Sequence, residues 1–589
     1  GISMAGLNIE KALEVSGNNN KYQKLLLITS CLVWFCVDFL SINVATLLFF
    51  PEMKCLSKKS GVYVECTEKD CCDENLYSHF IPEVKYNNIL TDRKLYCEKL
   101  QITMVAGVFT LGVVVGSYLA SYFADNYGRK LVALVSLISF SVFTVLFGLI
   151  DNTVIMIMGL FVIGLGSAGG TLSSFVLTME VVDTNKRNLY GVIINSSYGV
   201  SGLIYYGVFQ LSGEWMYMWI ISVFCGLISA LMLIIFFSES PRYYIAAGRK
   251  VDCLKALLNI AHMNGRRNLL MQFIKEEVLT DEQLFHLDQT IVNQLSFRYT
   301  EAYGVIDTLD YNPEHDEPFT NEHSKIFDSR RSEKCRTSIE EQISEELRTG
   351  IKELATSIGK DEDDFNTIVH SIPISKNKGD PGMTSLCKYK SVRSNFFSLS
   401  VIWMFTVFAY YGSSYDMKKI GSEIFVNGYI MYSAEFVAYW LCGVLMDIPL
   451  LGRVRTIGYN GLLVTASCVL YYFFRDNSPY NYILLFLFRI TVTSIFGTLY
   501  TFSTEIYPTS IRSKGFGLNV TFAKISTMVV AVTIDYYNPY PIFAGMGLAV
   551  FLLHFYLTET RGMPLKDQIP EIQEMKESCL IKESMKTDI

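Results

Sequence analysis

Two short stretches, GSYLASYFADNYGRK at residues 116–130 and EIYPTSIR at residues 505–512, decide how this sequence folds. Each lies beside long apolar runs, where a helix leaving a membrane would meet water. The first carries an acid followed by Gly-Arg-Lys, and the second begins with an acid and ends with an arginine. Opposite charges at such junctions can pair in one arrangement of the helices and separate in another. The two stretches therefore predict a charged gate between membrane helices.

The composition is that of a membrane protein. The chain has 589 residues, of which 50% are apolar, 14% aromatic and only 18% charged, with a mean hydropathy of +0.28. Soluble domains are usually about 25% charged. The deficit comes from many apolar runs of about 20 residues, the length at which a helix crosses about 30 Å of hydrocarbon. The net charge of −7 says little about partners, and no basic tract with interleaved aromatics suggests nucleic acid binding.

Twelve apolar segments predict twelve membrane-spanning helices. A loop at 51–101 follows the first, and a long charged segment at 238–395 separates the sixth from the seventh. The sequence therefore predicts an all-α membrane protein made of two six-helix bundles. The predicted spans are about 25–50, 102–123, 131–150, 154–177, 188–211, 215–237, 396–415, 424–446, 456–474, 481–503, 515–535 and 540–557; the bundles are 25–237 and 396–557, and the terminal segments are 1–24 and 558–589.

Basic residues and cysteines predict the same orientation. Basic residues near the span ends, such as Arg129 and Arg512, gather on the side of both termini and of the middle segment, which should be cytosolic. Five of the fourteen cysteines fall in the loop at 51–101, which favours disulfides on the opposite side and leaves their pairing open. That loop has no glycosylation sequon, so an internal organelle stays open beside the preferred cell surface. A cleavable signal peptide is not expected, because the first span is too long.

The middle segment begins with helical periodicity at 252–261 and becomes polar from about 275 to 385. Its mixed charges predict a solvated or partly disordered cytosolic insert. The alternative is a docking or phosphorylation segment that contacts a protein partner. Its histidines lack the spacing of metal ligands, so no metal site is expected.

Several further motifs follow one another along the chain. They are SFVLTME at 174–180 with Arg187 and Gly191 after it, ESPRYYIAAGR at 239–249, WMFTVFAYYG at 403–412, EIYPTSIR at 505–512 and TETRG at 558–562. Together they resemble the organic cation and organic anion transporters of the major facilitator superfamily, over the chain from the first span to about residue 570. The resemblance implies the twelve-helix fold and transport of organic ions through a site between the bundles.

The sequence departs from this family at several points. The loop at 51–101 is about half the usual length, and the insert is much longer. Leu160 stands where the family often has an Arg, and Val437 stands where it has a Pro. The resemblance therefore implies a divergent member.

Four ionisable residues fall inside the predicted spans: Asp38, Glu435, Arg489 and Lys524. A charge at the midplane costs about 2.5–3.5 kcal/mol on insertion scales, so it normally faces a cavity or a partner. Lys524 lies roughly ten residues from either end of its span, too deep to reach water easily. By the resemblance, it stands where cation transporters carry Asp and anion transporters carry Arg, which implies an anionic substrate. The alternative is that Lys524 pairs with Asp38 or Glu435 and only joins the bundles.

Other positions leave the substrate charge open. Tyr439 stands where anion transporters have a second basic residue, and Glu435 resembles an acid that cation transporters keep. A zwitterion would satisfy Lys524 and Glu435 together. Arg489 matches a basic residue of the anion-type relatives and favours the anion.

Aromatic residues complete the predicted binding site. Rings offer a large contact area to flat apolar solutes at little cost in entropy. The alternative for each ring is ordinary packing between membrane helices. By the resemblance, the rings that match cavity positions of the family are Tyr198, Trp403, Tyr410, Tyr411, Phe496 and Tyr500.

Charged residues recur at the span ends of both halves. They can form cytosolic latches that break when the bundles move. The alternative is simple anchoring of basic residues on the cytosolic side. The predicted gate residues are Asp125, Arg129, Lys130, Glu180, Arg187, Glu239 and Arg242 in the first half, and Asp447, Arg453, Glu505, Arg512, Glu559 and Arg561 in the second.

The predicted function is alternating-access transport of amphipathic organic anions; exchange against a small carboxylate is implied by the resemblance alone. Transport of cations or zwitterions, and proton coupling through Asp38 or Glu435, are alternatives. A different class of function is a non-transporting structural or sensing subunit with the insert as its docking arm. The sequence has no phosphate-binding Gly loop, no nucleophile with an evident base and no metal-ligand cluster, so we expect neither an enzyme nor a cofactor.

Overall fold

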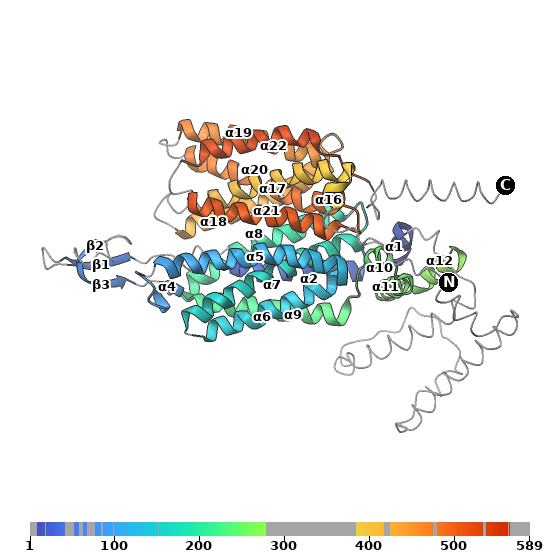
Figure 1. The fold of residues 1–589 in the computed structure, drawn as a ribbon, viewed down its shortest axis with the longest axis horizontal. Helices are drawn as coiled ribbons and strands as arrows, with labels where there is room; N and C mark the ends of the chain where they lie inside the picture. The colour runs from blue at the N-terminus through green and yellow to red at the C-terminus, as the bar shows by residue number, and fades with distance from the viewer. Residues whose placement is uncertain are drawn as a thin grey trace, which may run out of the picture. The chain divides into compact units, whose positions relative to one another are not determined.

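Helices dominate the computed structural model (Figure 1). Ten of the described helices are long and apolar enough to cross a membrane. The structure describes residues 9–17, 19–41, 52–57, 63–66, 77–83, 86–97, 99–150, 152–277, 385–416, 424–474, 480–533, 538–563 and 565.

The first half contains a helix at each of the first six predicted spans. Helix α7 packs on α5 and α6, while α2 packs on α8 and α9, and α6 also contacts α9. The predicted first span extends to residue 50, and its last nine residues lie outside the described ranges. The helices are α2 (Lys21–Ser41), α5 (Lys99–Tyr127), α6 (Arg129–Leu149), α7 (Thr153–Val181), α8 (Arg187–Ser212) and α9 (Trp215–Phe236).

The second half repeats this plan. Helix α19 packs on α20 and α22, and α17 packs on α20, α21 and α22. Helix α21 is 22 residues long but more polar than the ten apolar helices, and α22 has only 14 residues before a short 3₁₀ turn. The helices are α17 (Lys390–Asp416), α18 (Ile424–Asp447), α19 (Gly452–Phe474), α20 (Tyr480–Ile506), α21 (Arg512–Thr533) and α22 (Tyr540–Leu553), followed by η2 (His554–Tyr556).

The two halves meet along two pairs of helices. Helix α8 packs on α18, and α5 packs on α21. The amide of Asn188 on α8 donates to the carbonyl of Gly443 on α18 at 2.8 Å, which joins the halves near one end of the helices. We call this end the gate end; it holds the stretches at 116–130 and 505–512 quoted above.

Two glycines set the start of α6 and α19 at the gate end. Gly128 has φ 111° and Gly452 has φ 62°, backbone conformations that L side chains rarely adopt. A Cβ at Gly128 would collide with the carboxylate of Glu239, and a Cβ at Gly452 would meet that of Glu559. The Gly-Arg-Lys motif therefore owes its glycine to a tight turn beside a buried acid.

The loop at 51–101 contains elements that the sequence did not predict. Strands β1 (Glu52–Ser57), β2 (Tyr63–Cys66) and β3 (Tyr77–Glu83) form an antiparallel sheet in the order β2-β1-β3. Short α4 (Ile89–Asp92) follows, and the backbone of Asn87 bonds to Gly213 and Trp215 at the α8–α9 junction. Cys55 and Cys97 are each disulfide-bonded.

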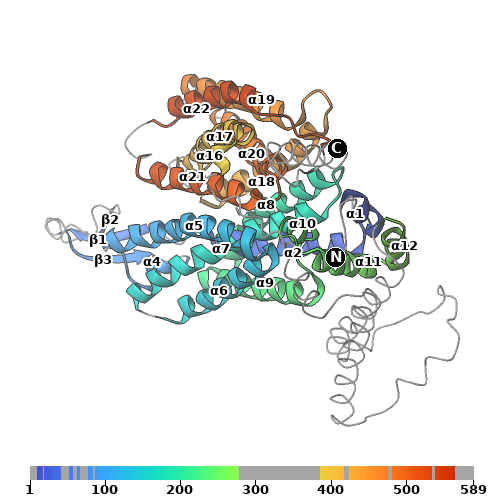
Figure 2. The same cartoon turned by 45° about the vertical axis from the view of Figure 1, so that its right-hand side comes forward.

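Short helices gather at the gate end (Figure 2). They are α1 (Ile9–Gly17), α10 (Pro241–Ala246), α11 (Lys250–Met263) and α12 (Arg267–Glu277), while α16 (Ser385–Lys388) lies beside α17. Helix α1 buries Ile9, Ala12 and Leu13 and packs on α11 and α12. Helix α11 coincides with the predicted periodicity at 252–261. The predicted insert at 275–385 lies outside the described residues except for its first three and its last residue.

Candidate functional site

A cavity lies between the two halves and is lined by helices from both. Helices α2, α5, α7 and α8 contribute from the first half, and α17, α20 and α21 from the second. Six of the ten predicted binding residues line it: Asp38, Tyr198, Tyr411, Phe496, Tyr500 and Lys524. The other four, Trp403, Tyr410, Glu435 and Arg489, are not among the lining residues.

Lys524 reaches this cavity from the middle of α21. Its ammonium donates to the hydroxyl of Tyr411 at 2.7 Å and lies 4.8 Å from the centre of that ring. No ion pair joins Lys524 to Asp38, Glu435 or another acid in the described part of the chain. These contacts therefore do not support the alternative in which Lys524 only joins the bundles through a salt bridge.

Asp38 lies on α2 and is almost fully buried. Its Oδ2 atom has no hydrogen-bond partner among the described residues, although Asp38 lines the same cavity as Lys524. Trp34, four residues earlier on α2, also lines the cavity and packs edge-on against Tyr500 at 4.9 Å between ring centres. Trp34 is not among the predicted binding residues; its i, i+4 spacing from Asp38 places both on one helix face and is the signal that could have revealed it.

Two of the predicted rings form a second layer behind the cavity wall. Trp403 donates from its indole N–H to Ser503 at 3.0 Å and packs edge-on against Phe496 and Tyr500. Tyr410 stacks on Phe496, with ring centres 5.0 Å apart and an interplanar angle of 10°. These rings hold Phe496 and Tyr500 in place rather than offering their own surface to the cavity.

Glu435 and Arg489 form a buried cluster with Tyr410 inside the second half. The Arg489 guanidinium pairs with the Glu435 carboxylate and donates to the Tyr410 carbonyl at 2.6 Å and to Ser413 at 2.8 Å. The Tyr410 hydroxyl donates to Glu435 at 2.8 Å, and the guanidinium carbon lies 3.7 Å from the centre of the Tyr410 ring. The cluster ties α17, α18 and α20 together, which gives Glu435 and Arg489 a packing role.

Replacing Glu435 with Gln is expected to destabilise the protein without changing the charge of its substrate. Removing one partner of a buried ion pair costs about 3–5 kcal/mol, because Arg489 would lose its carboxylate. The melting temperature of the purified variant should fall, while the relative uptake of anions and cations should match the parent. A variant of unchanged melting temperature with altered charge preference would show instead that Glu435 contacts the substrate.

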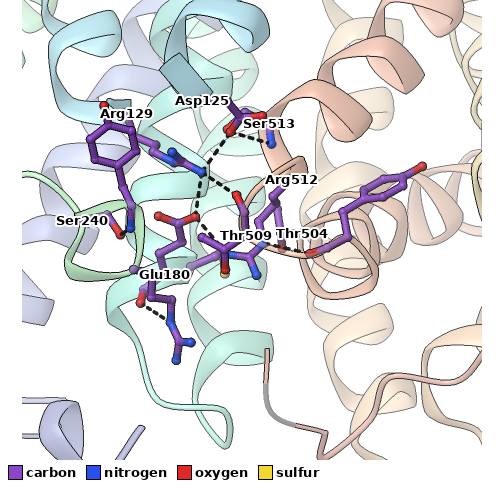
Figure 3. Close-up of polar contacts among 12 residues, drawn as sticks. Asp125, Arg129, Glu180, Ser240, Thr504, Thr509, Arg512 and Ser513 are labelled. Atoms are coloured by element: carbon purple, nitrogen blue, oxygen red, sulfur yellow. Dashed lines mark hydrogen bonds and ion pairs between the residues drawn. The ribbon is translucent and has the colours of Figure 1, made fainter. Parts of the chain in front are cut away.

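The gate charges of the first half meet those of the second around Glu180 (Figure 3). Glu180 Oε1 accepts from Arg512 Nη1 at 2.9 Å and lies 3.3 Å from Arg129 Nη2. Arg129 Nη2 also pairs with Asp125 at 2.9 Å and donates to the carbonyl of Thr509 at 3.1 Å. Glu180, Arg129 and Arg512 are fully buried, so these bonds join the halves out of contact with water.

Carboxylates at the gate also bond to helix N-termini. Asp125 accepts from the backbone N–H of Lys514 at 2.8 Å and of Ser513 at 3.3 Å, at the start of α21 in the opposite half. Glu239 accepts from the N–H of Arg129 and Lys130 at the start of α6, at 2.8 and 2.9 Å. Free N–H groups and the helix dipole favour negative charge at these ends. Burial nevertheless raises the pKa of Glu239.

The second half holds its gate charges mainly within itself. Arg453 bonds to both carboxylate oxygens of Glu505 at 3.1 Å, and Glu559 accepts from the N–H of Arg453 and Val454 at 3.0 Å. Asp447 is exposed, and its carbonyl rather than its carboxylate accepts from Arg561, at 2.7 Å. Asp447 is therefore not the counterpart of Asp125 in this arrangement.

Arg187 and Arg242 contact an acid, Glu10, that is not among the predicted gate residues. Glu10 Oε1 on α1 lies 2.6 Å from Arg242 Nη2 and 3.4 Å from Arg187 Nη2. Burial raises the pKa of Glu10, but the positive charges of Arg242 and Arg187 outweigh it and lower that pKa overall. The signal that could have found this residue is the short apolar pattern of Ile9, Ala12 and Leu13 around it.

The chain is similar in sequence to several known transporters. The chain is 21% identical to mouse solute carrier family 22 member 6 over 89% of this chain and 79% of that protein. It is also 21% identical to mouse organic anion transporter 3, over 83% of this chain and 75% of that protein. The human organic cation/carnitine transporter 2 is 21% identical over 84% of this chain and 74% of that protein. These relatives confirm the resemblance seen in the sequence motifs.

Solved structures and a family model agree on the fold. The chain resembles the proton:xylose symporter XylE bound to 6-bromo-6-deoxy-D-glucose, with a TM-score of 0.53 and 12% identity over 93% of this chain and 98% of that chain. At that identity the likeness bears on the fold alone, and it confirms the predicted all-α membrane fold. The family model described as Major Facilitator Superfamily matches residues 86–531. The chain, a multi-pass integral membrane protein, therefore belongs to the major facilitator superfamily.

Proposed function

We propose that this protein moves small organic ions across a membrane by alternating access and that Lys524 selects anions. It is a transporter rather than an enzyme. The relatives named organic anion transporter 3 and organic cation/carnitine transporter 2 support the substrate class. The observation that carries the choice of anion is the Lys524 ammonium at the cavity wall, held by Tyr411 and paired with no described carboxylate.

The electrostatics of the cavity favour an anion near Lys524. A fixed positive charge inside a protein is screened less than it would be in bulk water, so it attracts a carboxylate and repels an ammonium. The hydroxyl of Tyr411 and the rings of Tyr198, Phe496 and Tyr500 supply a polar contact and flat apolar surfaces. An amphipathic carboxylate would match both kinds of surface.

The gate-closed arrangement leaves little room at the site. The cavity volume is about 100 Å³. Pockets for drug-sized ligands usually measure roughly 300–1,000 Å³. We therefore propose that the cavity widens as the halves move, with the bonds of Glu180 and Asp125 breaking at the gate end.

Topology and location follow from the basic residues and the cysteines. We propose that the gate end faces the cytosol and that the loop at 51–101 lies on the other side, because basic residues concentrate at the gate end. A cell-surface membrane suits a disulfide-bonded loop. The insert at 275–385 would then be cytosolic and available to a protein partner.

The proposal is tested by uptake of a mixed panel into cells that express the chain. The panel contains labelled aromatic carboxylates, tetraalkylammonium cations and betaines. We expect saturable carboxylate uptake that unlabelled carboxylates inhibit and tetraalkylammonium ions do not. Uptake equal to untransfected cells for every solute, with recovery of the chain in fixed stoichiometry with other proteins, would favour a structural subunit instead.

A second candidate function is transport of a zwitterion. Asp38 favours it, because a buried carboxylate with an unpartnered oxygen lines the same cavity as Lys524. A betaine could place its carboxylate near Lys524 and its cationic nitrogen near Asp38 and the face of Trp34.

Replacing Asp38 with Asn separates the two candidates. If the substrate is a zwitterion, we expect betaine uptake to fall about tenfold while uptake of simple carboxylates is kept or rises, since one charge-assisted contact is worth roughly 1.5–3 kcal/mol. Kinetics of both substrates in the same cells provide the comparison. Equal losses for betaine and carboxylate would exclude a specific role of Asp38 toward the cationic group.

A further inference from the structure

The N-terminal helix α1 places an acid against two buried arginines of the gate end. The side chains of Arg187 and Arg242 are both 0% exposed, whereas that of Glu10 is 29% exposed. Glu10 Oε1 contacts both guanidinium groups, at 3.4 and 2.6 Å. One carboxylate thus bridges two like charges that would otherwise repel each other at close range.

The two arginines also hold the end of α7, which carries the central acid of the gate. Arg187 Nε donates to the carbonyl of Met179 at 3.3 Å, and Arg242 Nε donates to the carbonyl of Glu180 at 3.0 Å. Positive charge at the C-terminal end of a helix is stabilising. The carboxylate of the same Glu180 bonds to Arg512 in the opposite half. Glu10 therefore contacts Arg242, Arg242 contacts Glu180, and Glu180 makes the bond to Arg512 that joins the halves.

The arrangement is unequal in the two halves. Arg512 at the start of α21 pairs with Glu180 across the interface. Arg187 stands at the corresponding place, the start of α8, and the acid that corresponds to Glu180 is Glu505 at the end of α20. Glu505 instead bonds to Arg453 and Thr560 within its own half. Helix α1 supplies the acid that Arg187 does not take from the second half.

Helix α1 is also attached to the first half by polar contacts. The Asn264 side chain, at the end of α11, donates to the Ser16 carbonyl at 3.0 Å and accepts from the N–H of Tyr22 at 2.9 Å. Tyr190 on α8 donates to Asn19 at 2.7 Å. These contacts align α1 so that Glu10 meets the two arginines.

We propose that α1 is a strap that locks the gate end closed, with Glu10 as the residue that fastens it. When Glu10 is in place, Arg187 is neutralised and can lie close to Arg512 of the other half. When the strap is displaced, Arg187 loses the carboxylate of Glu10, and its repulsion from Arg512 of the other half favours separation of the halves. The conformational role rests on the proposed alternating access.

A native cysteine reports opening of this interface. Cys442 on α18 is free, 1% exposed, and packed with Val192 of α8 and Met446. Its neighbour Gly443 accepts the hydrogen bond from Asn188 in the opposite half. A water-soluble maleimide can reach Cys442 only when α8 and α18 separate, and peptide mass spectrometry distinguishes this cysteine from the others.

The test compares the maleimide reaction rate of Cys442 in the parent chain of residues 1–589 and in its Glu10→Gln variant. We expect the rate to rise about tenfold in Glu10→Gln, because a charge-assisted contact to two arginines is lost. Glu14→Gln on the same helix, where Glu14 is exposed, should react like the parent. Glu10→Asp, which keeps the charge on a shorter side chain, should lie between them and carries the same test if Glu10→Gln does not fold.

The strap proposal would be overturned if Cys442 in folded Glu10→Gln reacts no faster than in the parent. If only Glu10→Asp folds, the same criterion applies to that variant. The assay needs no solute, so it is independent of the transport proposal. Faster labelling of Cys442 in Glu10→Gln, without flux of any organic ion through the parent, would support the strap proposal and contradict the transport proposal. Organic ion flux through the parent, with unchanged labelling of Cys442 in Glu10→Gln, would support the transport proposal and contradict the strap proposal.

Discussion

Replacing Lys524 with Asp is expected to lower kcat/KM for an aromatic carboxylate by roughly 100-fold and to make tetraalkylammonium uptake detectable. The change removes the ammonium that Tyr411 holds at the cavity wall and places a second carboxylate in the cavity that already contains Asp38. Two negative charges in a weakly screened site repel an anion and attract a cation. Initial rates over a range of solute concentrations measure both effects.

Two variants control this experiment. Lys524→Arg keeps the charge and should retain anion preference, with a change in KM because the guanidinium has a different shape. Lys255→Asp makes the same charge reversal on α11, at a residue that does not line the cavity, and should leave uptake unchanged. If Lys524→Asp carries anions as well as the parent does, Lys524 does not choose the substrate charge.

Replacing Glu180 with Gln is expected to reduce transport of every substrate by roughly 100-fold. The Glu180 carboxylate contacts both Arg129 and Arg512 at the gate end. Its neutralisation leaves two buried guanidinium groups without that carboxylate, a loss of about 3 kcal/mol that shifts the closed-to-open ratio by roughly two orders of magnitude. A transporter that rarely closes at one end cannot complete its cycle.

Uptake kinetics with surface expression as the reference measure the Glu180 effect. Asp447→Asn is the matched control, because Asp447 is an exposed acid at the same end of the second half. It should transport nearly normally. Similar losses in the two variants would mean that total negative charge at the gate end matters and that the bonds of Glu180 do not.

Hydropathy predicted where the membrane helices lie, because each span must pair its own backbone and present apolar side chains to lipid. The segment predicted at 102–123 is helix α5, at Lys99–Tyr127. The hydropathy signal is weakest for α21, which carries Arg512, Lys514, Asn519 and Lys524 toward the gate and the cavity. The small sheet of the loop was missed because strands of four to seven residues leave little periodic signal.

The sequence predicts which charged residues lie deep in the membrane, but it does not predict which residues they contact. Glu435 and Arg489 were expected at the cavity because charges in lipid need a partner or water. They lie on neighbouring helices and satisfy each other behind the cavity wall. Lys524, at similar depth, finds a tyrosine hydroxyl and reaches the cavity. Whether a buried charge forms an ion pair or faces the cavity depends on the rotation of its helix and on residues far apart in the chain.

Contacts of short terminal helices are the hardest to anticipate. Glu10 and Arg242 are separated by more than 200 residues and meet because α1 packs on α11 and α12. Nothing in the charge pattern of the first 24 residues distinguishes Glu10 from Glu14.

Solute exchange in proteoliposomes tests the central account most directly. The purified chain is reconstituted with an unlabelled aromatic carboxylate inside the liposomes, and uptake of the same labelled carboxylate is followed. The account predicts saturable uptake that the internal carboxylate accelerates, with kcat/KM roughly 100-fold lower in Lys524→Asp. Uptake no faster than in protein-free liposomes, for carboxylates, tetraalkylammonium ions and betaines alike, would contradict it.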